Sequence, residues 1–591
     1  MEVYGADLNG IDGQLIRFEA VLEESRQGAA LLGLATKVVK EGYFRAIKAI
    51  QTLGDVWYQL VTNKGYVVQL SPAETPKQSS GLDLPIAVML LQAGILQAPD
   101  SLEQKIKEIE ERAERDEKKR EALLDQLQAL IEERRIVQQY RRRLAENTNK
   151  YLLIGTLDIA SGQLRSPQVG MFGMMAAAER GMTLIVPDEA EIHASIVHKH
   201  SRGVAVGIAA NINEVWNILL GAAPLRKVRS NRAPIQPRKF GGHVPDLREI
   251  EGVSRAKRAM AIALAGGHNI LLMGPPGQGK SMLATAAPNL LPELQGAEIF
   301  ELNKIYSARG QLGKNEVVLR RPFCEVQQSV TPAALLGGGA PPVPGLVSLA
   351  HNGVLFVDEI NLHNLHLIEQ LRNTLNDRVH RVQRARGTLE YPCRFTFAAA
   401  MNPCKCGWLL HYECPECKRT YFGESSTCKE HPTKNTVGKC RCSQREIEQY
   451  LNKLSMPLLD RIDLKVLVSS YDTSQGDEMR YASSTVKRQI ASARTIQRER
   501  YEGTASWVCN ADIPNKTKFK EHTPALRDGV ERYLETALRS LDLTKRMEVK
   551  VLLVSRTIAD FDESKEIRVG DVKEAIELMG LDQPYFKHFA K

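Results

Sequence analysis

The 591-residue sequence lacks long hydrophobic runs, since no apolar stretch reaches the roughly 18 residues needed to span a bilayer. Residues 1–13 carry acidic and polar side chains, so we expect no signal peptide there. Cysteine is scarce outside one region, because seven of the ten cysteines lie between Cys404 and Cys442. A disulfide framework is therefore not expected, and the sequence predicts a soluble, cytoplasmic protein with reduced thiols and no membrane partner.

The composition is that of a globular protein, with 43% apolar and 25% charged residues. The chain is much longer than one typical domain, so we expect roughly three to five folding units. A net charge of +9 permits an anionic partner but cannot identify one, because it is spread over the whole chain.

Residues 1–223 are interpreted as one α+β domain. Short strands are predicted at 15–20, 56–61 and 66–70, and helices at 38–52 and 84–93. Residues 101–147 contain neither Gly nor Pro and repeat apolar residues at helical spacing, which predicts an antiparallel helical hairpin with its turn near 116–120. The hairpin is interpreted as a solvated spacer or oligomer contact, with an arm for a protein partner as the alternative.

Residues 224–243 form a predicted linker, because the stretch 224–240 contains three prolines and is rich in Lys and Arg. Two interpretations of this stretch are equally supported. It is either an extended connection between domains or a segment that contacts phosphates directly.

A phosphate-binding loop follows a short buried-strand pattern at 269–273. The motif G-x-x-x-x-G-K-S spans 274–281 and precedes a helical run at 282–290, which is the context it needs. We expect Lys280 to reach the β- and γ-phosphates of ATP, and the Ser281 hydroxyl to bind Mg²⁺. The predicted ATP-binding residues are Gly274, Pro275, Pro276, Gly277, Gln278, Gly279, Lys280 and Ser281.

Two more strands end in polar residues that suit nucleotide hydrolysis. GVLFVDE at 353–359 places Asp358 to hold Mg²⁺ and Glu359 to polarise the attacking water. The strand at 394–400 leads to Asn402, which can sense the γ-phosphate. The pattern predicts an α/β fold with a parallel sheet and phosphates at its carboxyl ends.

The order of the phosphate loop, SLAHNGVLFVDE, AAMNPC and PLLDRIDL resembles the magnesium-chelatase-like AAA+ ATPases, and most closely the ComM/YifB family. LSPAETPK at 70–77, LDLPIAV at 82–88 and SRTIADF at 555–561 agree. The resemblance implies a homo-hexameric ring in which Arg461 is the arginine finger for the neighbouring subunit. It also implies a sensor arginine in a C-terminal helical lid, for which we favour Arg546 over Arg556.

The family's N-terminal part resembles the Lon protease domain, which uses a Ser nucleophile and a Lys base. Here the matching positions hold Asp83 and, near 169–181, Met171 without a Lys. A dyad without either member has no covalent route, so the domain is expected to be an inactive protease fold.

The clustered cysteines predict two structural Zn²⁺ sites of four ligands each. The inner site would use Cys414, Cys417, Cys428 and His431. The outer site would use Cys404, Cys406, Cys440 and Cys442, which match four cysteines that ComM-like proteins carry here.

Residues 376–397 predict a β-hairpin that, by the same resemblance, points into the ring pore. Its candidate DNA contacts are Arg381, Arg384 and Arg386; a solvated basic turn is the alternative. Gln327 and Gln328 stand where ComM-like proteins usually have two histidines, and Leu346 follows Val-Pro-Gly where R-P-G-E is usual, which weakens transfer of the DNA function.

The expected architecture is thus a degenerate Lon-like domain (1–223, with the hairpin 101–147), a basic linker (224–243), an AAA+ core (244–470, with a zinc-binding insertion 403–443) and a helical lid (471–591). The leading hypothesis is a hexameric, Mg²⁺-dependent ATPase that translocates single-stranded or branched DNA, as a branch-migration helicase in recombination. The alternative is a chelatase-like or MoxR-like ATPase that remodels a protein partner docked on the helical hairpin.

Overall fold

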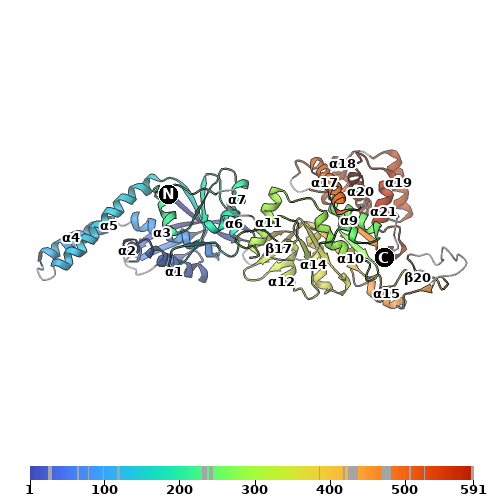
Figure 1. Ribbon diagram of the computed structural model, residues 1–591, viewed down its shortest axis with the longest axis horizontal. Coiled ribbons are helices and arrows are strands. Elements are labelled where there is room, and N and C mark those ends of the chain that lie inside the picture. The colour runs from blue at the N-terminus through green and yellow to red at the C-terminus, as the bar shows by residue number, and fades with distance from the viewer. Residues whose placement is uncertain are drawn as a thin grey trace. The chain divides into compact units, whose positions relative to one another are not determined.

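The computed structural model of the protein describes all residues except 24–28, 63–64, 78, 97–98, 116–119, 229–235, 239–243, 385–386, 417–419, 423–436, 469–480, 505–507, 525 and 588–591. The chain forms two compact units. Unit 1 comprises Met1–Arg238 and Gln295–Val318, and unit 2 comprises Lys239–Leu294 and Leu319–Lys591. Figure 1 labels their elements and colours them along the chain.

Unit 1 is built around a seven-stranded mixed sheet with the order β3-β4-β2-β1-β5-β8-β9. The pairs β1–β2 and β2–β4 are antiparallel, whereas the other neighbours run parallel. The strands are β1 (Glu2–Asn9), β2 (Asp12–Glu23), β3 (Ala29–Leu32), β4 (Gly65–Ser71), β5 (Lys150–Leu153), β8 (Met182–Pro187) and β9 (Ala205–Ala209), with a small ladder of β6 (Thr156–Leu157) and β7 (Leu164–Arg165). The helices are α1 (Lys37–Gln51), α2 (Asp55–Thr62), α3 (Asp83–Leu96), α4 (Pro99–Arg115), α5 (Arg120–Glu146), α6 (Met171–Ala176), α7 (Glu191–His200) and α8 (Ile212–Leu219).

The strand predicted at 56–61 is wrong, because these residues form helix α2. Aromatic and β-branched residues favour a strand locally. A helix instead brings Trp57, Leu60 and Val61 to one face, where Leu60 and Val61 are buried and the Trp57 ring meets Trp216 edge-on, with centroids 5.8 Å apart. Packing across the unit therefore overrides the local preference.

Helices α4 and α5 occupy the Gly- and Pro-free insert and pack against each other. Leu102 and Ile106 of α4 are buried, as their helical spacing suggests. The ion pair from Arg134 to Glu103, at 3.1 Å, joins the two helices on their exposed side.

Residues 295–318 belong to unit 1. The sequence pattern instead places them in the predicted AAA+ core at 244–470. They contain α11 (Gly296–Ala308), which packs on α6 and α7, and β12 (Glu316–Val317), which pairs with β10 (Gln236–Pro237). The Phe300 ring lies 5.4 Å from that of Phe172, and the Ser307 carbonyl accepts a 2.9 Å hydrogen bond from Gly170. Contacts this distant in sequence leave no local pattern.

Unit 2 contains a parallel five-stranded sheet in the order β13-β16-β19-β11-β23. Its strands are β11 (Ile270–Met273), β13 (Phe323–Glu325), β16 (Val354–Val357), β19 (Thr396–Met401) and β23 (Leu464–Leu467). The surrounding helices are α9 (Ser254–Gly266), α10 (Lys280–Leu290), α12 (Pro332–Leu336), α13 (Leu346–Leu349), α14 (Leu365–Asp377), α15 (Gln444–Leu451) and α16 (Met456–Leu459). Because every strand runs parallel, the residues after β11, β16 and β19 meet at one edge.

Three smaller ladders extend from this core. They are β14 (Gly337–Gly338) with β15 (Val343–Pro344), β17 (Val379–Arg384) with β18 (Gly387–Pro392), and a three-stranded sheet of β20 (His411–Glu413), β21 (Thr420–Phe422) and β22 (Val437–Gly438). The β17–β18 ladder is the hairpin predicted at 376–397.

The C-terminal part of unit 2 is helical. It consists of α17 (Ser483–Arg500), α18 (Lys516–His522), α19 (Asp528–Ser540), α20 (Lys545–Phe561), α21 (Val569–Leu578) and α22 (Pro584–Lys587), with the short 3-10 helix η5 (Asn510–Asp512). Helices α17 and α20 pack on α9 of the core, and their buried residues join the core cluster that includes β11 and β23.

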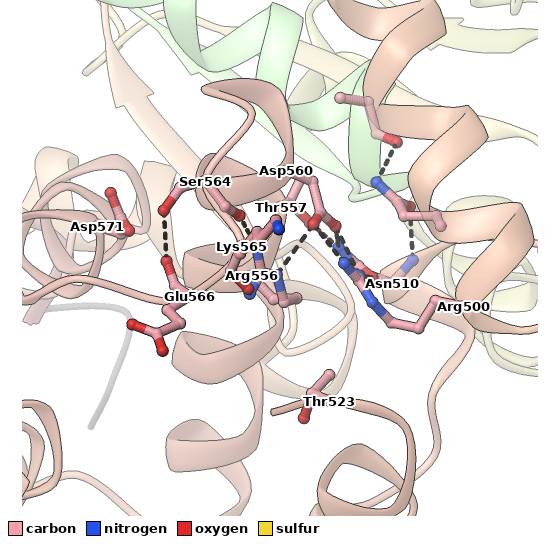
Figure 2. Close-up of polar contacts among 12 residues, drawn as sticks. Arg500, Asn510, Thr523, Arg556, Thr557, Asp560, Ser564, Lys565, Glu566 and Asp571 are labelled. Atoms are coloured by element: carbon pink, nitrogen blue, oxygen red, sulfur yellow. Dashed lines mark hydrogen bonds and ion pairs between the residues drawn. The ribbon is translucent and has the colours of Figure 1, made fainter. Parts of the chain in front are cut away.

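The C-terminal helices α17–α22, called the lid below, contain a buried polar cluster, whose contacts Figure 2 shows. The fully buried carboxylate of Asp560 accepts from Arg500 at 2.5 and 2.7 Å, from Arg556 at 3.0 Å and from Asn510 at 3.0 Å. Arg556 also donates to the carbonyls of Ser564 and Lys565. Breaking a buried ion pair of this kind typically costs about 3–5 kcal/mol. The SRTIADF motif therefore stabilises the lid, and its arginine, Arg556, makes its hydrogen bonds within the lid.

Candidate active site

The phosphate loop joins β11 to α10 at the carboxyl edge of the sheet. Gly277 and Gly279 adopt φ angles of +80° and +75°, which glycine takes without strain. Helix α10 begins at Lys280, whose ammonium donates to the Gly274 and Pro275 carbonyls at 2.7 Å each. Burial lowers the pKa of Lys280 to about 8, although Asp358 and Glu359 favour its charged form.

Asp358 and Glu359 follow β16 and face the start of α10. The Ser281 hydroxyl donates to Asp358 Oδ2 at 2.6 Å, so the two predicted Mg²⁺ ligands lie side by side. Glu359 has a φ of +46°, an uncommon conformation for a residue with a side chain. Such strain is typical of functional sites, and here it turns the chain sharply just after the strand.

Gln328 contacts this acidic pair, which the sequence reasoning did not foresee. Its amide donates to Glu359 Oε2 at 3.4 Å, from the segment just after β13. The only sequence signal was its position among the residues that differ from the ComM-like pattern.

Asn402 follows β19 and lies beside the phosphate loop. Its Oδ1 accepts from the Lys280 ammonium at 3.1 Å, which joins the predicted γ-phosphate sensor to the loop. The next residue, Pro403, accepts a 2.7 Å hydrogen bond at its carbonyl from the buried Tyr585 hydroxyl of α22. The end of the lid thus holds the backbone beside the sensor.

Arg461 lies between α16 and β23. It donates to the Pro457 carbonyl at 2.9 Å, and its buried Nε has no hydrogen-bond partner among the residues that the structure describes. Burial and the nearby Arg546 and Arg372 lower the pKa of Arg461. Arg546, near the start of α20, reaches Asp460 at 3.4 Å, so the predicted sensor arginine and the predicted arginine finger lie near one carboxylate.

The outer cysteine set is brought together. The sulfurs of Cys404, Cys406, Cys440 and Cys442 all lie within 4.8 Å of one another. Three of the separations are 3.4, 3.6 and 3.7 Å, close to the roughly 3.8 Å edge of a tetrahedron with Zn–S bonds of about 2.3 Å. Burial opposes ionisation, but hydrogen bonds from the Arg441 and Trp408 backbone lower the pKa of Cys406 to about 6. The donor set fits Zn²⁺.

The inner cysteine set cannot be assembled in the same way. Cys414 is buried directly after β20, whereas Cys417, Cys428 and His431 lie outside the described residues. The second zinc site therefore stays a prediction.

The cysteine module touches the phosphate loop through a glycine. Gly407 has a φ of +82°, and a Cβ there would lie 2.8 Å from Pro276 Cδ. The turn between Cys406 and Trp408 and the phosphate loop are therefore in direct contact within unit 2.

The hairpin arginines are placed only in part. Arg381 pairs with Glu390 at 2.8 Å and with Asp377 at 2.9 Å, so two carboxylates balance its charge. Arg384 ends β17, and Arg386 lies outside the described residues.

At the two positions that the sequence pattern matches to a protease dyad, the structure places Asp83 and Met171. Asp83 is 2% exposed and pairs with Arg45 at 2.7 Å, while its carboxylate also accepts from the Leu157 backbone. Burial raises the pKa of Asp83, and Arg45 opposes this. Met171 is buried in α6. Both residues stabilise the fold.

The fold and this site define a P-loop ATPase module of the magnesium-chelatase type. The family description "Magnesium chelatase, subunit ChlI" matches residues 246–424 and 423–476, "Magnesium chelatase, subunit ChlI C-terminal" matches 480–579, and "Subunit ChlI of Mg-chelatase" matches 18–111. The chain is 30% identical to the competence protein ComM of Haemophilus influenzae and 29% identical to the uncharacterised protein YifB of Escherichia coli, covering 97% of this chain and 96% of each relative. An uncharacterised Mycobacterium tuberculosis protein is 29% identical over 95% of this chain and 96% of its own length.

The chain therefore belongs to the ComM/YifB family of magnesium-chelatase-like AAA+ ATPases. Across the ranges that the structure describes, every helix is too short or too polar to cross a membrane.

Proposed function

We propose that the protein is a ring-forming, Mg²⁺-dependent ATPase whose active sites lie between subunits. The observation that supports this most is Arg461, whose buried Nε has no hydrogen-bond acceptor in the described part of its own chain. Arg546 and Arg372 disfavour its charged form, although Asp460 and Glu369 favour it. A neighbouring subunit's triphosphate would supply an acceptor and further negative charge. The family resemblance suggests a hexamer.

Each subunit would bind ATP with the loop at 274–281. Ser281 and Asp358 would hold Mg²⁺, which neutralises charge on the β- and γ-phosphates. Glu359 would orient and polarise the attacking water, and Asn402 would contact the γ-phosphate. Arg461 and Arg546 would act together from the adjacent subunit, because both flank Asp460.

The proposed substrate is single-stranded or branched DNA, and the proposed activity is branch migration in recombination. One of the relatives is named a competence protein. The hairpin that carries Arg384 and Arg386 would contact the DNA backbone in the pore. A zinc ion held by Cys404, Cys406, Cys440 and Cys442 would stabilise the insertion next to the nucleotide.

A second candidate function is remodelling of a protein partner. The pairing of Arg381 with Asp377 and Glu390 favours it, because a neutralised arginine contributes little to phosphate binding. The projecting α4–α5 hairpin would then be the docking arm.

ATPase assays with single-stranded, duplex and forked DNA at several salt concentrations distinguish the two functions. A DNA motor should be stimulated, and the stimulation should fall steeply with salt. Arg384→Glu with Arg386→Glu should abolish it. The matched variant Arg381→Ala should have a much smaller effect, since its charge is already balanced. Absence of stimulation and of binding at low salt would reject the DNA motor.

A further inference from the structure

The loop that carries Arg461 is held from the lid by one lysine. Lys550, on α20, lies 3.0 Å from Asp463 Oδ1 and donates to the backbone carbonyl of Asp460. These two contacts lie on either side of Arg461 in the chain. The Lys550 and Asp463 side chains are only 17% and 15% exposed, so water screens the pair weakly.

The same loop is held from the sheet by Asn269, at the start of β11. The Asn269 side-chain amide donates to the Arg461 carbonyl at 2.7 Å, and its backbone N–H donates to Asp463 Oδ2 at 3.3 Å. Its Oδ1 accepts from the Phe397 backbone of β19 at 3.1 Å. Asn269 fixes the loop to a rigid sheet, and Lys550 fixes it to the lid.

Asp463 is charged in this setting. Burial opposes its ionisation, but Lys550 and His268 hold its pKa well below the usual range. The nearby Arg546–Asp460 pair is different, because its side chains are 56% and 42% exposed, and such surface pairs contribute little. Lys550 is therefore the firm connection between lid and loop, whereas Arg546 can leave Asp460 at small cost.

We infer that Lys550 is a positioning residue for catalysis in trans. It fixes the loop from Asp460 to Asp463, so the lid of one subunit sets the orientation of Arg461 toward the nucleotide of its neighbour. This inference rests on the proposed interfacial active site.

Kinetics of Lys550→Met test the positioning. This variant keeps the aliphatic stem of the side chain but loses both polar contacts. Its kcat should fall about 10- to 100-fold, because a small misplacement of a catalytic group slows the reaction by about that much. KM for ATP should change less than twofold, because the phosphate loop is untouched. Lys550→Arg should recover most of the activity. Lys516→Met is the matched control. Lys516, on α18, pairs with Glu548 of α20 but does not contact the loop that carries Arg461, so the kcat of this variant should stay near the wild-type value.

Subunit mixing separates trans positioning from a purely structural effect. Lys550→Met subunits keep an intact hydrolytic site, and Glu359→Gln subunits keep an intact Arg461 loop. In a random 1:1 ring about one quarter of the interfaces combine the two intact halves, so the mixture should regain about one quarter of wild-type activity. Asp463→Asn, which removes the partner carboxylate without changing size, should be complemented in the same way.

Arg461→Ala mixed with Glu359→Gln is the reference. If that mixture regains activity but the Lys550→Met and Asp463→Asn mixtures show only the sum of their components, Lys550 acts within its own subunit and the inference is overturned. If the reference mixture also fails, the interfacial site itself is wrong and the inference falls with it.

Discussion

The lysine of the phosphate loop should make nucleotide binding depend on pH. Burial lowers the pKa of Lys280 to about 8, against the attraction of Asp358 and Glu359. A bound triphosphate favours the protonated ammonium, so a neutral lysine must take up a proton when ATP binds. Raising the pH through 8 should therefore weaken binding, whereas lowering the pH from 8 to 7 should strengthen it slightly.

The magnitude follows from the protonated fraction. With a pKa of about 8, Lys280 is about nine-tenths protonated at pH 7 and about one-tenth at pH 9, so the affinity for ATP should fall about tenfold. The terminal phosphate adds little to this change, because its last ionisation is nearly complete above pH 7.

Equilibrium binding of a fluorescent ATP analogue at constant Mg²⁺ and ionic strength measures the effect. A non-hydrolysable analogue avoids hydrolysis during the titration and leaves Glu359 in place, whose charge helps to set the pKa of Lys280. Lys280→Arg is the control, since an arginine stays charged throughout and its weaker binding should not vary between pH 7 and 9. A flat profile for Lys280, or an equal slope for the arginine variant, would refute the reasoning.

Three other changes address the rest of the molecule. Gly407→Ala should lower ATP affinity several-fold, because the new Cβ would press on Pro276, whereas Gly438→Ala in the same module, with 3.7 Å to its nearest neighbour, should not; nucleotide titration checks both. Cys442→Ser should remove about one zinc per chain by elemental analysis, and an unchanged zinc content would reject the outer site. Arg45→Met should destabilise unit 1 by about 3–5 kcal/mol in urea unfolding, since it leaves Asp83 buried and unpaired; a loss below about 1 kcal/mol would contradict this.

The arrangement of the candidate nucleotide-binding residues could be predicted because their pattern is local in sequence. Gly277, Gly279 and Lys280 follow a buried strand directly, and a parallel sheet brings Asp358 and Asn402 to the same edge. The outer cysteines were likewise readable from ligand type and number.

The remaining features depend on contacts between distant residues. Lys550 is almost ninety positions away from the loop that it holds, and the sequence of its own helix gives no indication of the contact with Asp463. Helix α2 was misassigned because the bulky residues of 56–61 suit a strand until Trp216 provides a packing partner. The sequence also suggested that the charge of Arg381 was free to bind a DNA phosphate, but in the structure Asp377 and Glu390 pair with it.

The discontinuous make-up of unit 1 has a consequence for biosynthesis. A ribosome delivers the chain from its N-terminus, but α11 and β12 lie at 296–308 and 316–317, after the phosphate loop. Until they emerge, Phe172 lacks the ring of Phe300 and β10 lacks its partner strand. The N-terminal unit therefore completes its folding only after the first segment of the nucleotide-binding unit, Lys239–Leu294, has been synthesised. A fragment ending at residue 223 would be released with part of its apolar surface uncovered.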